Sequence, residues 1–118
     1  MIHNKEKIEN CHRKVKELVS YLEQKYGVVY VTSGYRTKEE NIKLKNSAKK
    51  SLHMEGLAVN VHIPDVHVFK IAGDVIMNIL KYPIRGIGVN IFKRYIHFDF
   101  RRSDDLVTFV YGRDGYVS

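Results

Sequence analysis

The stretch YIHFDFR, residues 95–101, alternates apolar and polar side chains along its whole length. An extended strand turns successive side chains to opposite faces, so Ile96 and Phe98 share one face. His97 and Asp99 then share the other face. The stretch therefore predicts a strand with one face in a hydrophobic core and two chemically versatile side chains on the opposite face.

Helical patterns dominate the first part of the chain and strand patterns dominate the second. Apolar side chains recur at three- and four-residue spacing over 8–26 and 68–80, which predicts two amphipathic helices. Thr37 and Glu40 form a capping-box pattern, which predicts a short helix that begins at Lys38. We expect the other strands at 28–32, 58–63, 87–91 and 106–111.

These elements indicate one α+β domain over residues 1–118, with helices packed on one side of a small, mostly antiparallel sheet. A length of 118 residues with 44% hydrophobic side chains suits a single core and excludes intrinsic disorder. The single cysteine, Cys11, can form no internal disulfide and excludes a zinc site of four thiolates.

The chain carries 20 Lys and Arg residues against 13 Asp and Glu residues, a net charge of +7. Such a charge favours polyanionic partners, which include nucleic acid and an anionic cell wall. We rank nucleic acid last, and expect none, because the sequence contains no recognised binding motif. No apolar run is long enough to span a membrane. We expect a monomer. We also expect that the chain is made in a cytoplasm, because no signal peptide begins the sequence.

Histidines and oxygen donors gather on the polar faces of two predicted strands. Asn60 and His62 share a face of the strand at 58–63, as His97 and Asp99 do on theirs, and His53 lies in the loop that precedes Asn60. Two or three imidazoles with a nearby oxygen suit zinc, although chance alone often brings two histidines together. From spacing alone, an ordinary strand residue is the favoured interpretation of His97.

Four segments resemble the zinc D-alanyl-D-alanine carboxypeptidase family, which includes dipeptidases and phage endolysins that cut peptidoglycan stem peptides. They are SGYR at 33–36, SLHMEGLAVN at 51–60, GIG at 86–88 and IHFD at 96–99. The order and spacing match over roughly residues 28–102. The resemblance implies a small α+β domain with an antiparallel sheet and outer helices.

The resemblance also implies roles for individual residues. It places zinc ligands at His53, position 60 and His97, and an oxyanion-stabilising role at Arg36. A guanidinium suits that role because it presents paired donors to a developing negative charge. The family has Asp at position 60, whereas this chain has Asn60, an uncharged oxygen donor that we expect to hold zinc more weakly. His62 is a minor alternative ligand.

The chain also differs from the family at the position of the catalytic base. Many family members carry Glu or Asp three residues before the last histidine, where this chain has Arg94, which cannot serve as a base. Asp99 is the candidate base. It could instead orient His97, which we slightly favour, or pair with Arg101 or another arginine.

Two functional hypotheses follow. The first is a zinc-dependent carboxypeptidase or endopeptidase that hydrolyses peptidoglycan stem peptides and reaches the wall in a phage-associated or released form. The second is a catalytically altered relative that serves as a peptidoglycan-binding or structural module, which Asn60 and Arg94 favour.

Overall fold

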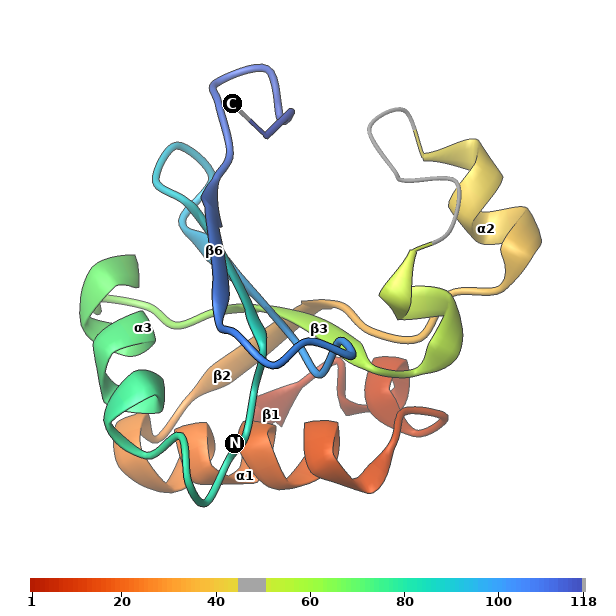
Figure 1. The fold of residues 1–118 in the computed structure, drawn as a ribbon. Coiled ribbons are helices and arrows are strands. Elements are labelled where there is room, and N and C mark those ends of the chain that lie inside the picture. The colour runs from red at the N-terminus through yellow and green to blue at the C-terminus, as the bar shows by residue number, and fades with distance from the viewer. Residues whose placement is uncertain (45–50, 118) are drawn as a thin grey trace.

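A six-stranded mixed sheet forms the centre of the computed structural model, which describes residues 1–44 and 51–117 (Figure 1). The strand order is β1-β2-β3-β5-β4-β6. The inner pairs β2–β3, β3–β5 and β5–β4 are antiparallel, and the outer pairs β1–β2 and β4–β6 are parallel. The strands are β1 (Ile2–His3), β2 (Val29–Ser33), β3 (Ala58–His62), β4 (Gly86–Asn90), β5 (Tyr95–Asp99) and β6 (Val107–Val110).

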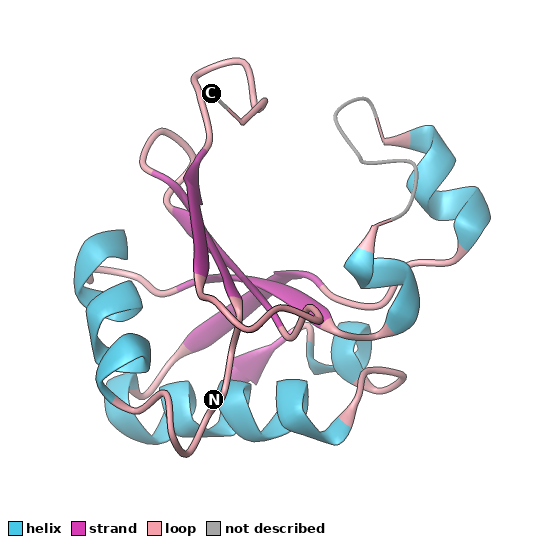
Figure 2. Ribbon diagram, viewed as in Figure 1, coloured by secondary structure: helices cyan, strands magenta, loops and turns pink. Residues whose placement is uncertain are grey.

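The longer helices, α1 (Arg13–Tyr26) and α3 (Val68–Met77), pack against one face of this sheet (Figure 2). Their buried side chains join the apolar faces of the strands in one core, which contains Leu18, Ile71 and Phe98. The short helix α2 (Lys38–Lys43) lies apart from α1 and α3 (Figure 1). Two 3₁₀ turns, η1 (Lys5–Ile8) and η2 (Leu52–Glu55), complete the structure. The predicted α+β class with a mostly antiparallel sheet is confirmed.

Local sequence signals explain several boundaries. The Thr37 hydroxyl accepts a hydrogen bond from the Glu40 backbone, and the Glu40 carboxylate accepts one from the Thr37 backbone, so the predicted capping box is present. The expected first helix is wrong at its start. His12 caps α1 by accepting a hydrogen bond from the Lys14 backbone, so the helix begins at Arg13. Cys11 lies before the helix but is still buried.

The third helix is shorter than the periodicity of 68–80 predicts. It ends at Met77, and the Asn78 side chain donates a hydrogen bond to the Asp74 carbonyl at 2.8 Å. Leu80 therefore lies outside the helix and is 98% exposed, not part of the core. Across residues 1–44 and 51–117, no helix combines the length and the apolar character that crossing a membrane requires.

Candidate metal centre

One row of paired residues crosses the sheet on the face opposite α1 and α3. Ser33 pairs with Asn60, Asn60 with His97, His97 with Gly88, and Gly88 with Phe109. Paired residues on neighbouring strands place their side chains on the same face. The strand pairing thus brings Asn60 and His97 together although 37 residues separate them.

His53 reaches this row from η2 and is 3% exposed. The Ser51 hydroxyl accepts a hydrogen bond from the His53 backbone at 3.2 Å, and Gly56 ends the turn with a φ of 70°, a left-handed conformation that suits glycine. The His53 Nδ1 donates to the Gly34 carbonyl at 2.8 Å. Burial, together with the nearby charge of Arg36, lowers the pKa of His53 to about 3. The ring is therefore neutral and keeps an unshared electron pair on Nε2.

His97 is oriented in the same way by a carboxylate. Its Nε2 donates to Asp99 Oδ2 at 2.7 Å, and its Nδ1 lies 2.9 Å from Asn60 Oδ1. Because an ionised carboxylate can only accept, the ring proton belongs on Nε2 and the unshared pair on Nδ1 faces Asn60. The ring centroids of His53 and His97 are 5.2 Å apart, and Asn60 also acts on the pKa of His53. Three of the expected site residues thus converge.

Asp99 is fully buried and its two oxygens are already occupied. Arg101 Nε donates to Oδ1 at 2.9 Å and Nη2 donates to Oδ2 at 2.8 Å, beside the bond from His97. Burial alone would raise the pKa of Asp99, but the hydrogen bonds from Arg101 and His97 outweigh it and hold that pKa well below its usual range. Gly86 leaves room for the carboxylate, since a Cβ there would lie 2.3 Å from both oxygens.

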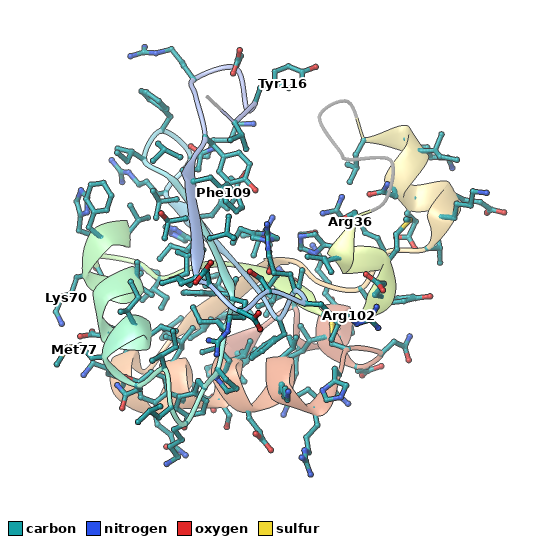
Figure 3. The ribbon with its side chains drawn as sticks, viewed as in Figure 1. Arg36, Lys70, Met77, Arg102, Phe109 and Tyr116 are labelled. Carbon is teal, nitrogen blue, oxygen red and sulfur yellow. The ribbon has the colours of Figure 1, made fainter. Side chains whose placement is uncertain are left out.

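Arg36 approaches from the loop between β2 and α2. Its Nη1 donates to Asn41 Oδ1 at 3.0 Å, and its backbone N–H donates to the His53 carbonyl at 3.1 Å. Its Nε is buried and has no hydrogen-bond partner within the described part of the chain. Figure 3 shows Arg36 on the α2 side of the molecule and Phe109 on β6. The charge of Arg36 acts on the His53 ring, which places the guanidinium near the cluster.

The three converging side chains suit zinc, which binds imidazole nitrogen and oxygen. Ligand histidines normally donate their second ring nitrogen to a carbonyl or carboxylate, as His53 and His97 do here. His97 Nδ1 and Asn60 Oδ1 lie 2.9 Å apart. Two electron-pair donors at that distance repel unless a cation lies between them, the amide turns its NH₂ to the ring, or the ring carries a second proton on Nδ1. The residues therefore fit a metal, with a neutral third ligand. Among residues 1–44 and 51–117, no three His, Cys, Asp or Glu side chains form a metal-binding group.

Two other histidines, His62 and His67, lie away from the cluster. His62 Nδ1 donates to the Arg94 carbonyl at 2.7 Å, so the structure does not bring His62 into the cluster. Arg94 sits in the turn between β4 and β5 with a φ of 57°. Both residues line a separate cavity of about 510 Å³ beside the start of α3. His67 caps α3 by accepting a hydrogen bond from the Phe69 backbone.

A family model described as Peptidase M15 matches residues 1–99. The chain belongs to the Peptidase M15 family. No curated protein and no solved structure matches the chain significantly. The residues matched in this Peptidase M15 chain include the whole cluster, from Arg36 to Asp99, whereas β6 lies beyond the match.

Sequence reasoning missed several residues that shape this Peptidase M15 site. Gly34 acts through its carbonyl, which no side-chain pattern reveals, and Asn41 lies in the helix that follows Arg36. Phe109 and Tyr111 place aromatic rings beside the cluster. Gly88 could have indicated the position of Phe109, because a glycine inside a strand often marks the close approach of another group.

Proposed function

We propose that this Peptidase M15 member is a zinc metallopeptidase that hydrolyses peptidoglycan stem peptides, as a carboxypeptidase or an endopeptidase. His53, Asn60 and His97 would hold the metal. The observation that carries this proposal is the pair of buried imidazoles whose second nitrogens are each engaged, at 2.8 Å by Gly34 and at 2.7 Å by Asp99. That arrangement leaves one electron pair on each ring for a metal.

Zinc, when bound, would polarise the scissile carbonyl and lower the pKa of water toward neutrality, so that the water proton passes to solvent and hydroxide is available to attack. The chain's own residues prepare the remaining steps. The Arg36 guanidinium, whose charge acts on His53, would supply donors for the oxyanion that forms as the carbonyl is attacked. Asn41 holds the guanidinium in place through Nη1, which limits its freedom before substrate arrives.

Asp99 serves in this proposal to position His97. Removing a proton from water would require a carboxylate oxygen that is free to accept it. Both oxygens of Asp99 already accept hydrogen bonds from Arg101, and one accepts from His97 as well. The same bonds keep its pKa low, which makes it a weak base. In many metal sites, a carboxylate that does not bind the metal accepts a hydrogen bond from a ligand histidine and orients its ring.

The net charge of +7 supports action at an anionic cell wall, where we propose that the protein works after release or in a phage-associated form. A basic surface would keep it near its substrate. Asn60 in place of a charged ligand remains compatible with catalysis, since an amide oxygen can bind zinc, but the metal then retains more of its positive charge.

Incubation of purified peptidoglycan with the protein and zinc tests this proposal. We expect release of D-alanine or of stem-peptide fragments, measured by mass spectrometry. Arg36→Ala should lower the rate by about 10²–10³ and leave the zinc content unchanged, because it removes an oxyanion donor. Arg13→Ala, on the exposed side of α1, is the matched control. Sedimentation with peptidoglycan without any release in the presence of zinc would instead support a binding module.

A further inference from the structure

Three aromatic rings form a continuous wall beside the metal centre, and two of them belong to the part of the chain beyond the family match. The centroid of Phe109 lies 5.5 Å from that of His97. Tyr111 lies 5.5 Å from Phe109 and 5.4 Å from Tyr95. The aromatic wall, defined as Tyr95, Phe109 and Tyr111, therefore runs from β5 to the end of β6.

The sheet is built to let Phe109 lean toward His97. Phe109 pairs with Gly88 on β4, and His97 pairs with the same glycine from the other side. A Cβ at Gly88 would lie 2.2 Å from Phe109 Cε2, so the ring occupies the space that a side chain on β4 would fill. The Arg101 guanidinium lies 5.7 Å from the centre of the Phe109 ring and so restrains it on another side.

The chemistry of the wall is apolar with neutral donors and positive neighbours. Burial raises the pKa of Tyr111, so its phenol stays protonated, and the charge of Arg36 acts on it from nearby. The one carboxylate on the polar face of β5, Asp99, is already engaged by Arg101 and His97. The wall therefore offers ring faces and a protonated phenol to a peptide, and its positive neighbours favour carbonyl and carboxylate oxygens.

We infer that Phe109 and Tyr111 are positioning residues whose rings hold the stem peptide against the candidate metal centre. This inference rests on the proposed function and names residues that contact the substrate. Both residues lie outside the matched region, so the contact is a property of this chain rather than of the shared cluster.

Steady-state kinetics on a synthetic stem peptide ending in D-alanyl-D-alanine, with zinc present, test the inference. Phe109→Leu should raise KM about tenfold with little change in kcat, because it removes ring contacts with the peptide and leaves the metal ligands in place. Tyr111→Phe should raise KM by a smaller factor. Val110→Ala, on the opposite face of the same strand and 48% exposed, should leave both constants unchanged.

Gly88→Ala provides a second probe, because it displaces the Phe109 ring without altering it. It should raise KM as Phe109→Leu does, and thermal melting shows which variants remain folded. If the wild type is active and folded Phe109→Leu has the same KM, the inference is wrong. If Phe109→Leu does not fold, an unchanged KM in folded Tyr111→Phe also overturns it.

A direct binding measurement separates this inference from the proposed function. Calorimetry with the same peptide and the zinc-supplied protein needs no turnover. If the wild type binds the peptide without cleaving it and Phe109→Leu binds it about tenfold more weakly, the wall is confirmed and the peptidase activity is not. If the wild type neither cleaves nor binds the peptide, the wall does not hold it and the inference fails.

Discussion

Arg101 and Asp99 form a two-pronged ion pair at the end of β5, with the two guanidinium nitrogens 2.9 and 2.8 Å from the two carboxylate oxygens. The Arg101 backbone N–H adds a third bond to Asp99 at 3.1 Å. Because the same carboxylate accepts the His97 ring proton, this pair fixes the orientation of a proposed zinc ligand. Arg101 thus acts on the candidate metal centre through Asp99 and His97.

Asp99→Asn should lower zinc affinity about 10- to 100-fold, the usual effect of removing a group that orients a ligand histidine. A competitive titration against a chelator measures this change, and Asp104→Asn on the exposed surface is the control. If zinc affinity is unchanged while peptide hydrolysis is abolished, Asp99 acts as the base and the positioning role is wrong.

Asn60→Asp should tighten zinc binding by roughly tenfold or more, because a charged oxygen replaces a neutral one beside a divalent cation. The same titration measures it. Thr32→Asp adds an equal charge on an exposed position of β2 and should change the affinity far less. An affinity that stays constant or falls in Asn60→Asp would show that residue 60 does not bind the metal.

The metal-free protein should lose stability as the pH falls from about 6.5 toward about 3. In that window unfolded His53 binds a proton that the folded, buried ring does not, so acid favours unfolding by about 1 kcal/mol per pH unit. The low pKa of Asp99 adds a further loss in acid, below its ordinary value of 3.8. Urea unfolding across this range measures the slope, which His53→Gln should reduce. An equal slope in that variant contradicts the assignment.

Two glycine substitutions should change stability in opposite directions. Gly86→Ala places a Cβ against the Asp99 carboxylate and should destabilise the fold by about 1–3 kcal/mol. Gly73→Ala in α3 meets nothing within 4 Å and should stabilise it by about 0.5–1 kcal/mol. Chemical denaturation compares them. A Gly86→Ala variant as stable as the wild type would mean that the carboxylate is not confined as described.

Much of the fold follows from local patterns. The two-residue period of β5 places Phe98 in the core and His97 on the opposite, polar face, because successive side chains of a strand point to opposite faces. The capping box at Thr37 fixes where α2 begins. The end of α3 was less predictable, because the apolar period continues to Leu80 whereas the backbone does not remain helical beyond Met77.

The residues of the candidate site could be proposed from the sequence, but the contacts that hold them could not. Asn60, His53 and His97 were candidates on residue type and resemblance, and the strand pairing supplies their convergence. Which group holds each ring depends on contacts over long sequence separations, such as His53 with the Gly34 carbonyl. The strand that carries Phe109 was expected, but no role was assigned to the residue itself. Its place beside His97 depends on the pairing of β6 with β4.

Zinc binding by single-histidine variants tests the central claim most directly. Native mass spectrometry and chelator competition should find one zinc per wild-type chain, and the site should be lost in both His53→Ala and His97→Ala. His62→Ala removes an imidazole that faces the Arg94 carbonyl instead of the cluster, so it should bind zinc as the wild type does. Retention of the zinc in His53→Ala and His97→Ala, or its loss in His62→Ala, would contradict the metal centre described for this chain.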